Sequence, residues 1–278
     1  MRKIEAKKIR QVVADLCVEA NHVLRPDVSL ALQKALARET NKRARGILGA
    51  IIANAGVAKR EKLAICQDTG FPVVFVEIGN GVCILGDLKE EINQGIVNGY
   101  KKGYLRDSIV RDPLLRGASG FGPAVIHVDI VKGDCARLTV LPKGFGCENK
   151  TQLKMFNPTA KLDEIKKFII EAVKSAGPDA CPPFVVGVGL GGTADYTMLL
   201  AKKALLRKLG ARSSELGARK LEQDLLKQIN RLNIGPMGLG GKTTALAVNI
   251  ETYPTHIAGL PIAVNISCHA LRSATAIL

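Results

Sequence analysis

The sequence is poor in aromatic residues. Tryptophan is absent, and aromatic residues make up only 4% of the 278 positions. A core with so few rings has to be aliphatic, and apolar residues, at 47% of the chain, are numerous enough to bury a substantial core. Glycine reaches 28 residues, which favours a site in which backbone lies close to a ligand over a site walled by aromatic rings. We expect a folded globular protein.

Long apolar runs are also missing. None reaches the ~18 residues that a membrane-spanning helix needs, and the basic N-terminus has no apolar segment of the kind found in signal peptides. We therefore expect a cytoplasmic protein without a membrane partner. Thiols are kept reduced in that compartment, so the seven cysteines are expected to fill the core or to bind a metal.

Two common motifs are absent. No two cysteines are separated by two residues, which argues against a zinc ribbon and against a thioredoxin-type redox site. The glycine-rich stretch 235–244 contains Gly241-Lys242-Thr243, but Pro236 stands where a phosphate-binding loop needs glycine. The spacing therefore excludes a nucleoside triphosphatase.

The charge is one-sided, with 40 Lys and Arg against 25 Asp and Glu and a net charge of +15. This excess calls for a negative partner, which can be a nucleic acid, an anionic metabolite or an acidic subunit. The basic clusters are not interleaved with aromatic residues, and they form no helix-turn-helix or zinc-finger pattern. We expect no nucleic-acid partner.

Apolar periodicity predicts an α+β fold with a mixed, largely antiparallel sheet packed with helices. Helical spacing dominates residues 1–62, which we expect to form an N-terminal helical layer. Strands are expected in the remaining portion, 63–278, and the whole chain is expected to be a single domain. Turn signals predict two hairpins, and the expected strands are 73–78 with 82–85, 123–131 with 135–141, and then 184–190, 245–250 and 261–266.

Three stretches carry chemistry. Residues 64–70 (AICQDTG) place a thiol, an amide, a carboxylate and a hydroxyl in succession between a helical pattern and a strand pattern, although a polar turn is the alternative. Residues 142–151 contain glycines that can present amides to an anion, and Cys147, which either binds a metal or lines the loop. Cys181 precedes two prolines that fix the backbone after the thiol.

Other candidates are more ambiguous. Arg106, Arg111 and Arg116 either grip a dicarboxylate or lie on the surface, and His256 follows a Tyr-Pro-Thr loop. Three thiolates can hold three irons of a 4Fe-4S cluster and leave the fourth iron open as a Lewis acid. The spacing of the cysteines alone leaves core packing as the alternative.

Five segments in order resemble the class I, iron-sulfur-dependent fumarate hydratases, and specifically the separate alpha subunit of two-chain fumarases and L-tartrate dehydratases. The segments span nearly the whole chain. They are 66–70 (CQDTG), 144–150 (GFGCENK), 180–183 (ACPP), 238–242 (GLGGK) and 265–268 (NISC).

The resemblance implies a set of site residues. The cluster ligands would be Cys66, Cys181 and Cys268, the catalytic residues Asp68 and His256, with His256 near the reacting oxygen, and the substrate contacts Gln67, Asp68, Arg106 and the backbone of Gly146. Cys147 stands where many relatives have serine. We do not expect it to be a ligand, because a fourth thiolate would close the open iron.

The resemblance also implies a function. We expect the alpha subunit of a fumarate hydratase, which reversibly hydrates fumarate to (S)-malate. L-tartrate dehydratase is the alternative that the sequence does not separate, and a nonenzymatic basic binding protein is a remote one. The family's remaining substrate-binding parts belong to a C-terminal domain that residues 1–278 do not include. We therefore expect a dicarboxylate substrate, a separate beta subunit and an α2β2 assembly.

Overall fold

The computed structural model describes residues 1–211 and 216–278. Contacts within the chain divide it into two compact units. Unit 1 comprises Met1–Arg25, Asn54–Phe145 and Arg272–Leu278, and unit 2 comprises Pro26–Ala53 and Gly146–Leu271. The expectation of a single domain stays a prediction.

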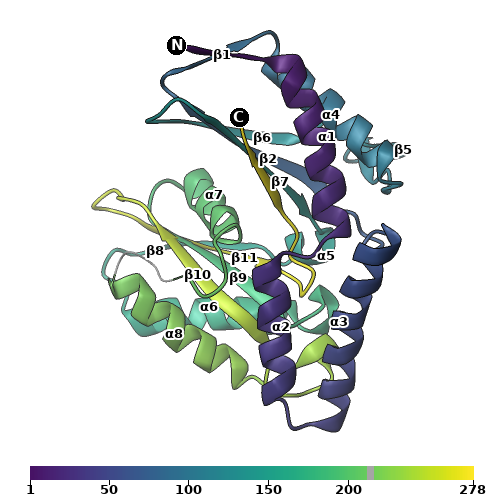
Figure 1. The fold of residues 1–278 in the computed structure, drawn as a ribbon. Helices are drawn as coiled ribbons and strands as arrows, with labels where there is room; N and C mark the ends of the chain where they lie inside the picture. The colour runs from purple at the N-terminus through teal and green to yellow at the C-terminus, as the bar shows by residue number, and fades with distance from the viewer. Residues whose placement is uncertain (212–215) are drawn as a thin grey trace. The chain divides into compact units, whose positions relative to one another are not determined.

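Unit 1 contains a four-stranded sheet with the order β12-β7-β2-β6 (Figure 1). The strands are β2 (Phe71–Gly79), β6 (Val125–Val131), β7 (Ala136–Lys143) and β12 (Ala274–Ile277). Strand β2 pairs antiparallel with β7 and parallel with β6, and β12 pairs antiparallel with β7. Two smaller pairs complete the unit, β1 (Arg2–Glu5) with β3 (Val82–Leu85) and β4 (Ile109–Asp112) with β5 (Arg116–Gly120).

Helices α1 (Ala6–His22) and α4 (Leu88–Lys102) pack on this sheet through one aliphatic cluster. The two helices lie very close together because α4 has glycine at the contact. A Cβ atom on Gly95 would lie 2.6 Å from the Arg10 carbonyl oxygen, and one on Gly99 would lie 2.6 Å from that of Ala14. The shared core includes Ile9, Val13, Val74, Ile96 and Leu138.

Both predicted hairpins are wrong. Strand β3 pairs with β1, and β2 lies between β6 and β7. The prediction was drawn from turn residues next to each strand, which are a local signal. Val73, Val74 and Val76 point alternately to the two faces of the sheet and are each at most 2% exposed, as expected of a central strand with both faces covered.

Unit 2 contains the second four-stranded sheet, with the order β10-β9-β11-β8. The strands are β8 (Gln152–Phe156), β9 (Phe184–Leu190), β10 (Ala245–Thr252) and β11 (Leu260–Ser267). Strand β9 runs parallel to β10 and antiparallel to β11, and β8 pairs antiparallel with β11. Antiparallel pairs outnumber parallel ones among the described strands, so the α+β class with a largely antiparallel sheet is confirmed.

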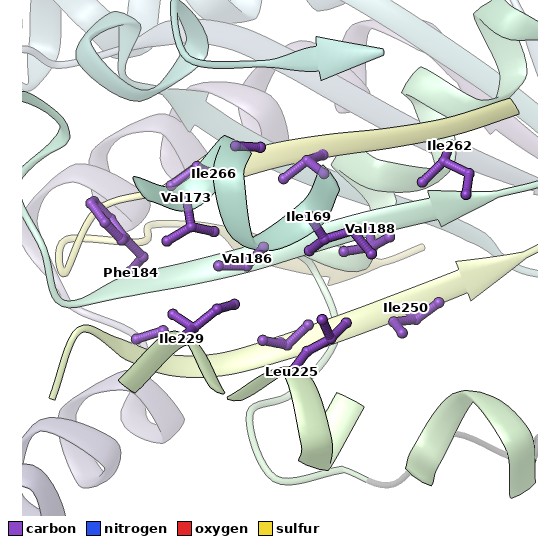
Figure 2. Packing of buried hydrophobic residues seen from close by; sticks show 14 of the residues in the cluster. Ile169, Val173, Phe184, Val186, Val188, Leu225, Ile229, Ile250, Ile262 and Ile266 are labelled. Atoms are coloured by element: carbon purple, nitrogen blue, oxygen red, sulfur yellow. The ribbon is translucent and has the colours of Figure 1, made fainter. Parts of the chain in front are cut away.

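Helices cover both faces of the β9–β10 pair. Val186 and Val188 pack with α6 (Leu162–Ala176) and α8 (Leu216–Asn230) in an aliphatic core that Figure 2 shows at close range. Residues alternate between faces along a strand, so Gly187 and Gly189 face the other side, where α7 (Ala194–Ala204) lies. The predicted N-terminal helices are present as α1, α2 (Pro26–Arg38) and α3 (Lys42–Glu61), divided between the two units.

Helix α7 lies so close to β9 that only glycine fits between them. A Cβ atom on Gly189 would lie 2.1 Å from the carbonyl oxygen of Thr197, which belongs to a helix that cannot shift alone. Gly189→Ala should therefore lower the free energy of unfolding by about 2–3 kcal/mol, measured by chemical denaturation. The matched control is Gly46→Ala in α3, where no atom lies within 4 Å of the new Cβ. That change should raise stability by roughly 0.5–1 kcal/mol, and equal effects of both changes would contradict the packing described.

Candidate functional site

The loop 66–70 is placed by strand pairing. Phe71 at the start of β2 is in register with Lys143 at the end of β7, so the residues before β2 lie beside the residues after β7. Gly70 has a φ of +81°, and a Cβ there would lie 2.5 Å from the carbonyl carbon of Pro142. Glycine is therefore required where the loop enters the sheet.

Asp68 joins the loop before β2 to the residues that follow β7. Its Oδ1 accepts a hydrogen bond from the Gly70 amide (2.9 Å), and its Oδ2 accepts one from the Phe145 amide (2.8 Å). Its backbone carbonyl accepts a third from Nη2 of Arg272 (2.7 Å). A carboxylate can accept about four hydrogen bonds, so Asp68 keeps acceptor capacity for a further donor.

Two further hydroxyls fix the loop. The Tyr100 hydroxyl lies 2.9 Å from the Gly70 carbonyl and 3.1 Å from that of Thr69. Burial raises the pKa of Tyr100, so its phenol stays protonated and donates. The Thr69 Oγ1 accepts from the Arg106 amide (3.0 Å), which brings Arg106 to this loop with an exposed side chain. Gln67 is exposed as well, so both predicted substrate contacts are accessible in unit 1.

Sequence reasoning missed Arg272. It is 3% exposed, and its Nε and Nη1 have no hydrogen-bond partner among the described residues. A buried guanidinium next to Asp68 with N–H groups still available is suited to donate hydrogen bonds to a carboxylate. The only signal in the sequence was its position four residues after Cys268.

Cys181 and Cys268 lie on neighbouring turns of unit 2. Cys181 precedes β9 and Cys268 follows β11, and the antiparallel register of Val185 with Ser267 brings these two strand ends together. The His269 amide and Nδ1 both donate to the Cys181 carbonyl, at 3.4 and 3.1 Å, which requires the tautomer with hydrogen on Nδ1. Both thiols are half-buried, whereas Cys66, also half-buried, belongs to unit 1.

The segment 144–150 continues beside Cys181 in unit 2. The Cys147 thiol is 5% exposed and donates to the Ala180 carbonyl at 3.2 Å. Gly146 is close enough that a Cβ there would lie 3.6 Å from the Asp179 carbonyl oxygen. The predicted amide contact at Gly146, in the short helix α5 (Phe145–Glu148), therefore lies beside the turn that leads to Cys181.

The glycine-rich segment 238–242 supports the same turn. A Cβ on Gly238 would lie 2.3 Å from the Cβ of Pro178, and the Met237 amide donates to the Pro182 carbonyl at 2.8 Å. The Lys242 amide donates to Oε2 of Glu39 in turn (2.7 Å). This segment therefore packs against the Cys181 turn and stabilises it.

His256 lies at the opposite end of the unit 2 sheet. Its loop connects β10 to β11 and is bonded to the end of β9, where the Tyr253 amide donates to the Leu190 carbonyl. Cys181 precedes the start of β9, whose seven residues extend about 23 Å. The Nδ1 of His256 accepts from the Ala258 amide (3.1 Å), so Nε2 carries the hydrogen of the neutral ring. The structure does not bring His256 to the two thiols within unit 2.

The thiols differ in chemical setting. Burial raises the pKa of Cys17 strongly, so this thiol is an inert core residue. Cys66, Cys181 and Cys268 are half-buried, and thiolates are the ligands that iron-sulfur clusters use, so the donor set fits such a group. Within residues 1–211 and 216–278, no three His, Cys, Asp or Glu side chains are already grouped to hold a metal ion.

The described helices include none that is long and apolar enough to cross a membrane.

The bonding of Asp68 can be tested through stability. Asp68→Asn replaces one acceptor oxygen by an NH2 group, which must then face the amide of Gly70 or Phe145. We expect the free energy of unfolding to fall by about 1–3 kcal/mol in denaturant titrations. The control Asp107→Asn changes an exposed carboxylate and should stay within roughly 0.5 kcal/mol. A stable Asp68→Asn variant would show that these bonds do not hold the loop.

The chain resembles known proteins over nearly its whole length. A family model described as "Fumarate hydratase (Fumerase)" matches residues 10–277. An L(+)-tartrate dehydratase subunit alpha of Escherichia coli (strain UTI89 / UPEC) is 31% identical over 272 residues, which cover 96% of this chain and 90% of the relative. A Methanocaldococcus jannaschii protein, which carries the same name with a provisional qualifier, is 40% identical over 275 residues, covering 96% of both chains.

Proposed function

Because the chain belongs to the fumarate hydratase (Fumerase) family and is a hydro-lyase, we propose that it is the alpha subunit of an iron-sulfur enzyme that dehydrates L(+)-tartrate. The observation that carries the proposal is the end-to-end similarity to chains named as this subunit. Fumarate, which we expected from the sequence, becomes the second candidate and is supported by the family model. The remote alternative of a nonenzymatic binding protein is wrong.

The proposed cofactor is a 4Fe-4S cluster held by Cys66, Cys181 and Cys268. This ligand set rests on the resemblance and is supported by the half-buried state of all three thiols. When bound, such a cluster supplies a Lewis acid at the iron that lacks a protein ligand. Cys147 is already engaged as a donor to the Ala180 carbonyl, which supports leaving it out of the set.

The proposed substrate contacts involve residues of this chain. The exposed Arg106 side chain offers a planar guanidinium for one substrate carboxylate. Gln67 and the remaining acceptor sites of Asp68 orient a substrate hydroxyl, and Asp68 passes a proton to or from it. The Gly146 amide offers a further donor. A net charge of +15 attracts a dianionic substrate.

The proposed role of His256 carries a condition. Within one chain, the length of β9 separates its loop from Cys181 and Cys268. His256 can therefore hydrogen-bond the departing oxygen only in a site to which a second chain contributes.

A separate beta subunit and an α2β2 assembly belong to the proposal. The relatives' names call each of them a subunit alpha, which supports a second kind of chain. The excess of basic residues makes an acidic partner chain favourable.

The cluster ligands can be tested without measuring activity. Anaerobically prepared protein should be brown, and Cys181→Ser should lose the visible absorbance and most of the bound iron. The matched control is Cys147→Ser, because a hydroxyl can still donate to the Ala180 carbonyl and the iron content should be unchanged. Wild-type protein without iron, or equal iron in the Cys181→Ser variant, would refute the ligand set.

The substrate can be tested with the reconstituted pair of subunits. We expect no dehydratase activity from this chain alone, and a kcat/KM for L(+)-tartrate that exceeds the value for (S)-malate by at least about tenfold. The reason is that a site built to bind an additional hydroxyl leaves its polar groups unpaired with a substrate that lacks it. The reverse ratio would support the fumarate alternative, and activity without a second chain would contradict the role of subunit alpha.

A further inference from the structure

Strand β6 lies at one edge of the unit 1 sheet, and among the strands of residues 1–211 and 216–278 it pairs with β2 alone (Figure 1). Its apolar side chains are unusually exposed, at 42% for Val125, 51% for Val128 and 81% for Ile130. Proteins normally protect such an edge with lysine, proline or a bulge, and the sequence of β6, VIHVDIV, contains neither lysine nor proline. An edge of this kind is a ready site for pairing with a strand of another chain.

The hydrogen bonds to β2 show which backbone groups are available. The Asn80 amide donates to the Val131 carbonyl at 2.8 Å, so the backbone polar groups of Val131 face β2. Because these groups alternate in direction along a strand, those of Ile126, Val128 and Ile130 face the open edge. This edge can receive another strand.

The sequence of β6 is complementary to itself. Two antiparallel copies centred on Val128 would place Val125 opposite Val131 and Ile126 opposite Ile130. The same register places His127 of each copy opposite Asp129 of the other. We propose that β6 pairs with β6 of a second copy of this chain across a two-fold axis at Val128, which joins the two sheets into one.

The surroundings of Asp129 favour this partner. In the register of β2 with β6, Asp129 lies beside Glu77, whose carboxylate pairs with Nε of Arg137 on β7 at 3.5 Å. A His127 ring on the other side provides a cation or a hydrogen-bond donor. Stacking on Phe75 at a centroid distance of 5.1 Å holds the His127 ring in place. An acidic partner chain is less suited, because β6 contains neither lysine nor arginine.

The backbone orientation allows a direct test by sedimentation of the full-length chain. The Val128 amide faces the open edge, so Val128→Pro removes a donor from the proposed seam and leaves the bonds to β2 in place. We expect a dimer for the wild-type chain and a monomer for this variant at the same concentration. An unchanged far-ultraviolet circular dichroism spectrum would show that the variant is folded, although its melting temperature should fall with the loss of the dimer.

A pair of charge variants tests the register even if the proline variant fails to fold. His127→Asp places aspartates opposite each other across the seam, and Asp129→Lys places lysine opposite histidine, so each alone should weaken dimerisation at least tenfold. A mixture of the two variants should form heterodimers. In the mixed pair, the aspartate introduced at position 127 of one copy would face the lysine introduced at position 129 of the other, and the unchanged Asp129 would face the unchanged His127, so both cross-strand contacts join groups of opposite charge. Asp107→Lys, an exposed change away from β6, is the control and should leave the dimer intact.

Three outcomes would overturn the proposal. They are a wild-type chain that stays monomeric, a dimer that none of the β6 variants weakens, and a mixture that fails to associate. If the variants instead release only the beta subunit from a monomeric alpha chain, β6 is its docking strand and the self-pairing is wrong. The measurement needs neither a cluster nor activity, so its failure leaves the proposed dehydratase chemistry untouched and bears only on how the two alpha chains of the proposed α2β2 assembly meet.

Discussion

The antiparallel pairing of β2 with β7 determines where the chemistry of unit 1 lies. In an antiparallel pair, the start of one strand adjoins the end of the other. The residues before Phe71 and those after Lys143 therefore lie at the same end of the two strands. Unit 2 uses the same arrangement, because Cys181 precedes β9 and Cys268 follows the antiparallel β11. In each unit, distant stretches of sequence meet because strand register fixes their ends.

Hydrogen bonds to backbone groups then hold these stretches in place. Asp68 binds two amides, Thr69 fixes the backbone of Arg106, and His269 binds the Cys181 carbonyl. These contacts restrict the loops while Gln67 and the Arg106 side chain stay exposed. Residues whose backbone is already held by hydrogen bonds are suited to binding. They lose little conformational entropy when a ligand binds.

Much of this could be predicted from local sequence. The strand expected over 184–190 matches β9, because its apolar run is continuous and is followed directly by glycine. The motif segments placed Asp68, Cys181 and Cys268 at the edges of elements. The hairpins failed because strand partners are chosen by burial over long distances, which a turn signal does not report. Arg272 was missed for the same reason, because its partner Asp68 is 204 positions away.

The bond from the Cys147 thiol to the Ala180 carbonyl has a consequence for exchange at this position. A thiol in that role needs only to donate a hydrogen, which the hydroxyl of serine does better over a shorter reach. Serine at this position keeps the hydrogen bond, whereas a metal ligand would tie the position to sulfur. The turn before Cys181 thus keeps its hydrogen bond from residue 147 with either cysteine or serine at that position.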